Sequence, residues 1–503
     1  MNSTTITDAL KKGERVTLEC KRAQAEVPKS VWPTYSAFAN TIGGLILLGI
    51  EENLKEKDPE KRFLILGVND PEKIVKDFWN TIHCDKVSDN ILIDSDVEIV
   101  NLNGAQVVCI RVPQADWRVK PIYLNGNVYK NTYRRNHEGD YHCTEAQVKA
   151  MIRDANDNGN DSVLIDYYGM EDIDQDSLRQ YRSEFRQENS THIWNKDDDK
   201  TFLRNLGGYM EDRKSGREGL TLAGLMMFGK GLAIRDRFAN FRMDYLDMSH
   251  LVGDERYHDR LTYDGRWENN LYQFFRIVSP KIQFDLPRPF KLEKGGKRID
   301  DTPQHEAVRE AFTNAIIHSD LLMDAGILRV EKHDDKLVFR NPGLLKLPIE
   351  AIYQGGNSKA RNPKIQNMLR MIGFGENVGS GFPKIIAAWK DTNWGNPELK
   401  NKLDVDEVEL VLPVPTSAPI NEKSNVTVNV AVNAIEELTE RQRIIYNIIN
   451  LNVVEDVVVT ASSLSRQLNV HPRTIQRDLA VLASKSLVRH VGSDKHGHWE
   501  AVK

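Results

Sequence analysis

The spacing of hydrophobic residues changes along the chain and predicts a succession of helices and strands. Residues 33–40 (PTYSAFAN) carry apolar side chains at helical spacing, and the apolar run at residues 45–50 (LILLGI) predicts a buried strand after a Gly-Gly break. Residues 107–112 (VVCIRV) predict another strand. Residues 122–133 predict a strand pair, because Asn125-Gly126 is typical of a two-residue hairpin turn.

The central part of the chain continues this mixed pattern. The apolar stretch at residues 220–229 (LTLAGLMMFG) is typical of a core element rather than a cofactor site. Residues 305–320 predict one helix that turns Phe312 and Ile316 inward, and residues 327–343 predict a β-hairpin. These elements indicate further α/β segments.

Three helical patterns precede a strand pattern in the last segment. Thr439-x-x-Gln442 has capping-box spacing before an apolar helix face. Residues 460–468 predict a second, short helix, and residues 471–487 predict a third. Residues 487–502 predict a two-stranded wing with a polar tip.

Together the patterns predict an α+β multidomain protein. A chain of 503 residues is too long for one hydrophobic core and indicates three or four domains. The Pro/Ser/Asn-rich stretch PVPTSAPINEKSN is typical of a linker. We expect segments at residues 1–150, 151–290, 291–412, a linker at 413–436, and a last domain at 437–503.

Charge and cysteine content narrow the choice of partners. The net charge of −5 means that a nucleic acid would have to bind a local basic patch, and residues 461–503 carry seven Lys/Arg against three Asp/Glu. The four cysteines form no CxxC pair, so we expect buried free thiols. No apolar run is long enough to cross a bilayer, and the first residues have no signal-peptide pattern. We therefore expect a cytoplasmic protein without membrane contact.

The first segment contains a specific motif. Glu14, Glu19 and Lys21 in GERVTLECKR precede SAFANTIGGLILLGI, and Glu51-Glu52 follows directly. The pattern resembles the Alba-like domain (AlbA_2) of Schlafen proteins and bacterial regulators, and it extends over about 140 residues. The resemblance implies an α/β module that binds nucleic acid, with RNA among its expected partners.

Some Schlafens cleave structured RNA with glutamates at this spacing. The resemblance therefore implies a candidate catalytic site, with Mg²⁺ or Mn²⁺ held by Glu14 and Glu19, at the following residues: Glu14, Glu19, Lys21, Glu51 and Glu52. Here Glu51 or Glu52 replaces the usual aspartate and Cys20 replaces a phenylalanine. Two alternatives stay open: a solvated strand whose glutamates pair with nearby Lys and Arg, and nucleic-acid binding without chemistry.

A second motif lies in the predicted helix at residues 305–320. Glu310, Asn314 and His318 recur once per helical turn. The spacing is similar to the N-box of the gyrase, heat-shock chaperone, histidine-kinase and mismatch-repair (GHKL) group, whose ATP-binding domain is an α/β sandwich. The resemblance implies that Glu310 positions water and that Asn314 holds Mg²⁺.

The same resemblance implies further ATP-binding residues. Asn341 and Gly343 fall where the group reads adenine with an aspartate and a glycine, and the phosphate-lid glycines correspond to Gly373, Gly375, Gly379 and Gly381. Asn341 lacks the charge of a carboxylate, and the glycines could equally cap helices and permit turns. No G-x4-GK[ST] motif is present, which excludes a P-loop helicase.

The helix predicted at residues 471–487 presents side chains that reach bases and phosphates in a major groove. They are Arg473, Thr474, Gln476 and Arg477. The whole last segment resembles a winged helix-turn-helix. A winged helix that contacts protein rather than DNA is the alternative.

The sequence thus predicts a transcriptional regulator that contacts DNA through its C-terminal winged helix, as a dimer or other homo-oligomer, and that ATP modulates. One alternative is a metal-dependent endoribonuclease, for example in defence against phage, with the winged helix as a targeting module. Weak ATPase activity is a further expectation. A nucleotide-gated scaffold for protein partners is the third hypothesis.

Overall fold

The computed structural model divides the chain into two compact units, Met1–Thr416 and Ser417–Lys503. The structure describes residues 3–11, 16–53, 55–56, 58, 62–137, 139–287, 301–356, 359–375, 381–415, 442, 445–446, 449, 460–461, 464–465, 470–484, 487–491 and 498–501. Each unit is considered by itself. Glu14 and Gly379 lie outside the described residues.

The first part of the larger unit is a small α/β module. Its four-stranded sheet has the order β1-β2-β6-β5, in which β1 and β2 are parallel and the other pairs are antiparallel. The elements are α1 (Ser3–Lys11), β1 (Leu18–Lys21), α2 (Val31–Asn40), β2 (Gly44–Leu48), β3 (Ile50–Glu52), β4 (Phe63–Ile65), α4 (Pro71–Ile82), β5 (Val97–Leu102), β6 (Ala105–Val112), β7 (Tyr133–Asn136), β8 (Gly139–His142) and α5 (Glu145–Asp154).

The helix predicted at residues 33–40 and the strands predicted at 45–50 and 107–112 are confirmed by α2, β2 and β6. Gly43 allows the turn between α2 and β2, because it has φ +77° and a Cβ there would lie 2.8 Å from the Val112 carbonyl oxygen. The strand pair predicted at 122–133 is wrong. Asn125 and Gly126 do form a turn with positive φ, but they lead into isolated bridges rather than continuous strands.

The rest of the larger unit is built on a six-stranded sheet with the order β12-β11-β13-β14-β16-β15. Its elements are α6 (Gln175–Glu188), α7 (Asp199–Leu206), β9 (Tyr209–Glu211), β10 (Glu218–Leu220), α8 (Leu222–Phe228), α9 (Gly231–Arg237), β11 (Arg242–Asp247), β12 (Asp259–Leu261), α10 (Leu271–Gln283), α11 (Pro303–His318), β13 (Ile327–Lys332), β14 (Lys336–Pro342), α12 (Ile349–Gln354), α13 (Pro363–Arg370), α14 (Gly381–Lys390), β15 (Glu398–Lys402) and β16 (Glu407–Pro413). β11 and β13 run parallel, and the remaining pairs are antiparallel.

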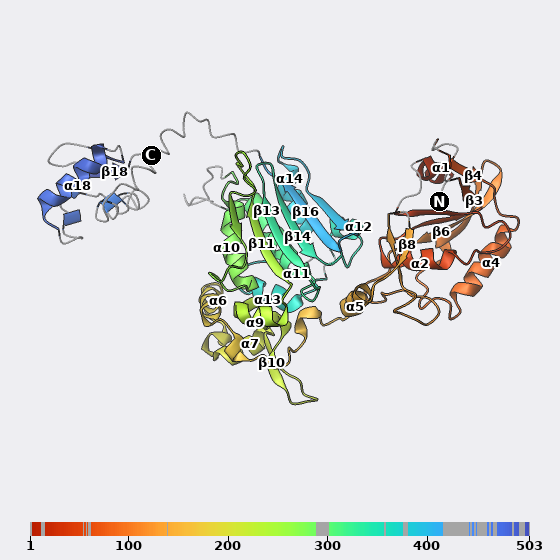
Figure 1. Cartoon of the computed structure of the whole chain (residues 1–503), viewed down its shortest axis with the longest axis horizontal. Coiled ribbons are helices and arrows are strands. Elements are labelled where there is room, and N and C mark those ends of the chain that lie inside the picture. Colours follow the sequence, from red (N-terminus) through yellow and green to blue (C-terminus); the bar gives the residue numbers. More distant parts are fainter. Residues whose placement is uncertain are drawn as a thin grey trace. The chain divides into compact units, whose positions relative to one another are not determined.

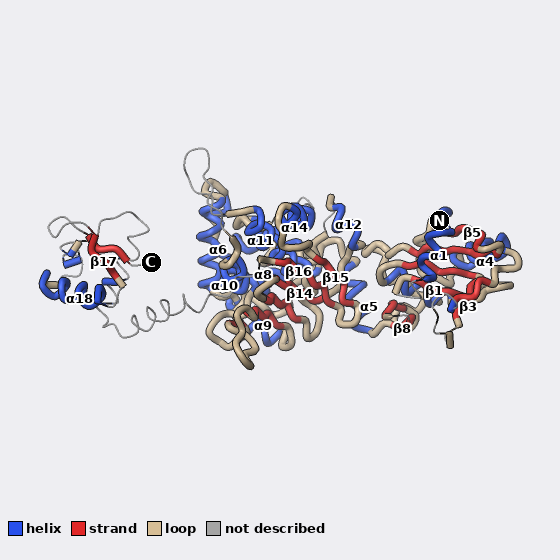
Figure 2. The backbone as a smooth tube through the Cα atoms, turned by 90° about the horizontal axis from the view of Figure 1, so that it is seen from above, coloured by secondary structure: helices blue, strands red, loops and turns tan. Residues whose placement is uncertain are grey.

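Helices α11 and α14 cover one face of this sheet, as Figure 2 shows above strands β14, β16 and β15. Figure 1 shows the same sheet in green to light blue. Met226 of α8, Phe274 of α10 and Phe312 of α11 belong to one hydrophobic core, in which the Phe274 and Phe312 rings meet edge to face at 5.7 Å. Strands on both sides of the predicted boundary at residue 290 therefore share one sheet and one core.

In the smaller unit the structure describes α18 (Pro472–Ser484) and an antiparallel strand pair, β17 (Val488–Val491) and β18 (His498–Ala501). Ile475, Leu479 and Leu482 of α18 are fully buried. The helix at 471–487 and the strand pair after it are confirmed. The winged-helix class of the whole unit stays a prediction.

Two further predictions concern cysteines and membranes. Cys20, Cys109 and Cys143 are buried free thiols, as expected, whereas Cys84 is exposed. Of the helices that the structure describes, none combines the length and apolar character needed to span a bilayer.

Candidate functional site

The glutamates of the N-terminal motif that the structure describes, Glu19, Glu51 and Glu52, contact separate cations. Glu19 on β1 is buried, and it pairs with Lys21 and, through Oε2, with Nη1 of Arg135 at 2.8 Å. Arg135 is 1% exposed and also pairs with Asp140. A carboxylate held between two cations behaves as a structural ion pair.

Glu51 and Glu52 on β3 each contact a different arginine. Glu51 lies 3.6 Å from Nη1 of Arg22, and Glu52 pairs with Arg62 at 2.5 Å. Among the residues that the structure describes, no three His, Cys, Asp or Glu side chains gather as metal ligands do. The described geometry therefore favours the ion-paired alternative for Glu19, Glu51 and Glu52.

A pocket in the larger unit brings together several residues that the sequence singled out for ATP binding. One wall is α11, which presents Glu310, Asn314 and His318. Asn341 of β14 and Gly381 at the start of α14 also line the pocket. These residues are separated by as many as 71 positions in sequence, since 381 − 310 = 71. The fold unites five of the nine residues that the sequence singled out.

The Glu310 end of the pocket is tightly built. Nδ2 of Asn314 donates to Oε1 of Glu310 at 3.2 Å. A Cβ on Gly381 would lie 2.2 Å from Oε1 of Glu310, so an alanine here would force the end of the Glu310 side chain to shift. The first backbone amides of a helix favour anions.

Asn341 adds an unused donor to the lining of the pocket. Its side chain is 5% exposed, and Nδ2 has no hydrogen-bond partner. A buried unpaired donor costs about 1–3 kcal/mol, so a ligand atom that accepts from Nδ2 would recover free energy. Pro342, which follows, supplies no backbone N–H.

Two cations shape the His318 end. Burial, with Arg361 and Lys346 nearby, lowers the pKa of His318 to about 4, so the ring is neutral at pH 7. Burial also lowers the pKa of Lys346 to about 8. Both cations line the pocket together with Lys359. This end therefore carries positive charge beside a neutral imidazole.

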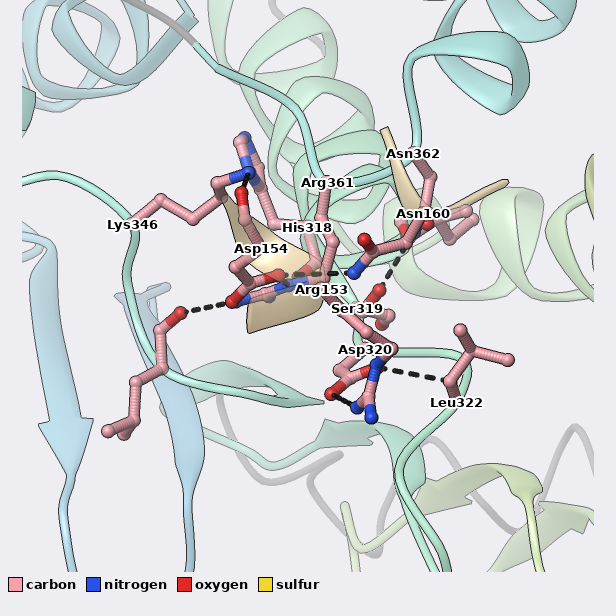
Figure 3. A network of polar contacts seen from close by, with 12 residues as sticks. Arg153, Asp154, Asn160, His318, Ser319, Asp320, Leu322, Lys346, Arg361 and Asn362 are labelled. Carbon is pink, nitrogen blue, oxygen red and sulfur yellow. Dashed lines mark hydrogen bonds and ion pairs between the residues drawn. The ribbon is translucent and has the colours of Figure 1, made fainter. Parts of the chain in front are cut away.

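Arg361 is the centre of a polar network, shown in Figure 3. Its Nε and Nη2 donate to the two carboxylate oxygens of Asp154, each at 2.8 Å, and its other contacts are the carbonyl oxygens of His318 and Leu344. Lys346 donates to the Asp154 carbonyl oxygen at 2.7 Å. The pocket wall is thereby fixed to the last residue of α5 (Figure 3).

Of the remaining predicted glycines, the three that the structure describes, Gly343, Gly373 and Gly375, do not line this pocket. Gly343 has φ +90° and passes beside Arg361. Gly373, with φ +86°, follows α13, and its N–H bonds to the Arg370 carbonyl oxygen, as in a helix cap. Gly375 also has positive φ, and a Cβ there would meet Thr313.

Sequence reasoning missed Lys346, Lys359 and Arg361. They lie in irregular segments without helical or strand periodicity, so no spacing relates them to α11. The sequence feature that could have revealed them is the surplus of basic over acidic residues between β14 and α13.

The candidate DNA face lies on α18. Arg473, Gln476 and Arg477 are exposed, and Thr474 is half-buried. Asp478 is buried on the other side and accepts from Gln442 at 3.1 Å. The basic and amide side chains are therefore free to meet a partner, while the helix is anchored through its apolar face.

Comparison with known families gives three matches. Residues 14–144 match the Schlafen AlbA_2 domain, and residues 327–412 match the HATPase_c_4 family, described as "Putative ATP-dependent DNA helicase recG C-terminal". Residues 149–244 match a domain of unknown function, DUF8451. The chain thus combines an AlbA_2 domain with a divergent ATPase-like domain. No curated protein matches the chain.

Solved structures also resemble the chain, among them the following two. A crystal structure of a Corynebacterium diphtheriae protein is 14% identical, covers 99% of each chain and has a TM-score of 0.38. The NMR structure of the N-terminal domain of an ATP-dependent DNA helicase RecG-related protein from Nitrosomonas europaea is 24% identical. That alignment covers 29% of this chain and 94% of the domain, with a TM-score of 0.22.

Proposed function

We propose that the chain is a nucleic-acid-binding transcriptional regulator whose α11–α14 pocket binds ATP and whose C-terminal unit contacts duplex DNA. The chain joins an AlbA_2 domain to a RecG-type C-terminal domain, which makes it a nucleic-acid-related protein. The observation that carries the proposal is the pocket itself, in which Glu310, Asn314 and Asn341 converge from separate elements.

The pocket residues fit a nucleotide. Asn341 offers an unpaired Nδ2 to a ring nitrogen of adenine, and its Oδ1 accepts from the 6-amino group. Apolar side chains beside it, Phe339 and Leu410, contact the base. The start of α14, at Gly381, receives phosphate at its backbone amides.

Asn314 would hold a divalent cation through its amide oxygen, with Glu310 beside it. Bound Mg²⁺ would neutralise phosphate charge. Glu310 is placed to orient a water molecule, which makes weak hydrolysis an expected secondary activity. His318, neutral at pH 7, closes the other end of the pocket without adding charge.

DNA binding is assigned to α18. Arg473 and Arg477 contact phosphates or guanine, and Gln476 contacts a base edge in the major groove. A dimer of the chain would present two such helices to two half-sites of an operator. The AlbA_2 domain is the proposed RNA-binding part.

The test uses the full-length chain and two ligands. ATP should raise the melting temperature of the wild type, and Asn341→Leu should reduce that rise. Arg473→Gln/Arg477→Gln should weaken binding of operator-length duplex DNA and make the slope of log K against log salt about 2 less negative. An unchanged melting temperature with millimolar ATP and Mg²⁺ would remove the nucleotide part of the proposal.

A third experiment, a cleavage assay, distinguishes the regulator hypothesis from the nuclease hypothesis. Labelled tRNA and duplex DNA are incubated with the chain and Mg²⁺ or Mn²⁺, with and without EDTA. Intact nucleic acid supports the regulator. Metal-dependent cleavage that is lost in Glu19→Gln would contradict the regulator proposal and would identify an endoribonuclease instead.

A further inference from the structure

A basic hollow lies at the edge of the six-stranded sheet, away from every residue discussed above. It is lined by Arg235 of α9, Arg242 of β11 and Arg260 of β12, with Tyr263 and Asn269 from the loop that follows, and we call it the arginine basin. Its volume of about 710 Å³ is typical of ligand clefts, for which about 300–1,000 Å³ is usual.

The basin exists because β12 is short. β12 pairs with Tyr245, Leu246 and Asp247, the second half of β11. The first half of β11, from Arg242 to Asp244, pairs with β13 on one side but has no strand on the other within the described sheet. This open edge forms the wall of the basin.

The arginines of the basin are weakly neutralised. The guanidinium of Arg235 lies 5.0 Å from the Tyr263 ring centre, and that of Arg260 lies 5.0 Å from the Tyr257 ring centre. In the described part of the chain, neither Arg235 nor Arg260 forms an ion pair with a carboxylate. Tyrosine rings orient these cations without cancelling their charge.

Arg242 is the third cation. Its Nη2 lies 3.9 Å from Oδ2 of Asp244, and Asp244 also lies 3.7 Å from Arg329. One carboxylate is therefore shared loosely by two arginines. The second aspartate of the basin, Asp264, pairs with Arg266 at 2.6 Å. The hollow keeps a surplus of positive charge.

Asn269 adds an unused acceptor. Its side chain is 3% exposed, lines the basin, and has no hydrogen-bond partner for Oδ1. Such an atom is costly when unpaired. A ligand that fits the basin should therefore carry anionic groups and also a hydrogen-bond donor, such as the amino group of a base or a ribose hydroxyl.

We propose that the arginine basin binds single-stranded nucleic acid. Phosphates contact the three arginines, a base stacks on Tyr263, and an amino or hydroxyl group donates to Asn269. A positively charged groove that also presents an aromatic side chain to the bases is typical of single-strand sites. The bases of a duplex are stacked and paired, so they could not reach the buried Oδ1 of Asn269.

This site goes beyond the proposed DNA contact of α18. It lies in another unit of the chain, and it prefers a strand whose bases are exposed. A regulator with both sites could hold a duplex and a separated or transcribed strand at the same time.

The test measures binding of a labelled 20-nucleotide single strand to the full-length chain by fluorescence anisotropy, between 50 and 200 mM salt. All proteins carry Arg473→Gln/Arg477→Gln, which removes the α18 contribution. Arg235→Gln/Arg242→Gln/Arg260→Gln should weaken binding at least tenfold at 50 mM salt. The slope of log K against log salt should become less negative by about 2, because each released phosphate contributes roughly 0.7.

A matched control removes equal charge elsewhere. Arg179→Gln/Arg186→Gln/Arg213→Gln changes three exposed arginines outside the basin and should leave the slope unchanged. The charge-preserving variant Arg235→Lys/Arg242→Lys/Arg260→Lys should retain most of the slope of log K against log salt. Tyr263→Leu should lose about tenfold in affinity through lost stacking.

Three outcomes would overturn the proposal. The first is that the protein with an intact arginine basin and the two α18 substitutions binds no single strand. The second is equal weakening by the basin and control triples. The third is displacement of the strand by polyglutamate at the same charge concentration as by unlabelled strand, which would identify a site for acidic peptides.

Discussion

Arg361 and Asp154 form a two-point ion pair, with Nε–Oδ1 and Nη2–Oδ2 distances of 2.8 Å. Arg361 lines the candidate nucleotide pocket, and Asp154 ends α5, the first helix after the residues that match AlbA_2. A nucleotide that attracts the Arg361 guanidinium would compete with Asp154 for it. The pair is therefore a physical route by which pocket occupancy could alter the anchorage of α5.

Breaking this pair should destabilise the larger unit strongly. Asp154→Asn leaves the 3%-exposed Arg361 side chain with an uncompensated buried charge, for which we expect a loss of about 3–5 kcal/mol. The measurement is chemical unfolding followed by tryptophan fluorescence. The control is Asp157→Asn, whose exposed pairing with Lys359 at 3.9 Å should contribute less than about 0.5 kcal/mol. Equal effects of the two substitutions would contradict the role assigned to Asp154.

Asn341→Leu should separate ligand binding from folding. The substitution removes a buried donor that has no partner, so the ligand-free chain should keep or slightly raise its melting temperature. ATP affinity should fall about tenfold or more. Isothermal titration of both proteins with ATP checks the result, and unchanged affinity would exclude Asn341 from the base contact.

Gly381→Ala should damage the pocket by crowding Glu310. The new methyl group would lie 2.2 Å from Oε1, so the flexible end of the Glu310 side chain must move, and we expect a loss near the lower end of the about 1–3 kcal/mol that overpacking costs. Because the clash is with one side chain, Glu310→Ala in the same chain should restore much of the loss. Thermal unfolding of the single and double variants measures this coupling. Additive losses would show that Gly381 is needed for its backbone conformation instead.

Stability should fall between pH 7 and pH 4 in part through His318. Its folded pKa is lowered from 6.5 to about 4, so the unfolded chain binds a proton in this window that the folded chain does not. The shift corresponds to roughly 3 kcal/mol, and we expect about 1–2 kcal/mol because the ring borders an open pocket. Urea midpoints at several pH values should show a shallower decline in His318→Gln. An identical decline in both proteins would contradict this assignment.

Site residues of this protein are best predicted from sequence where they recur at the period of a helix. Glu310, Asn314 and His318 share one helix face, so their spacing alone places them together. Asn341 and Gly381 required the resemblance to a family. Arg361 could not be placed, because its role depends on a long-range pairing with Asp154, and nothing in local sequence relates the two positions.

The N-terminal glutamates are a case in which spacing along the sequence misleads. Their spacing suggests a cluster, yet Glu19 is occupied by Arg135, which is 116 residues later in the chain (135 − 19 = 116). The turn at Asn125-Gly126 was found correctly from local preference, but the strands around it depend on pairing partners that local sequence does not specify.

The parallel pairing of β11 with β13 also limits how this protein can be cut or recombined. A fragment beginning at residue 291 would retain β13 to β16 but lose β11, which pairs with β13, and β12 beyond it. That edge, with Leu328 and Val330 in its strand, would be a template for aggregation. Expression fragments, and exchanges of modules between related genes, should therefore keep residues 242 to 413 in one piece.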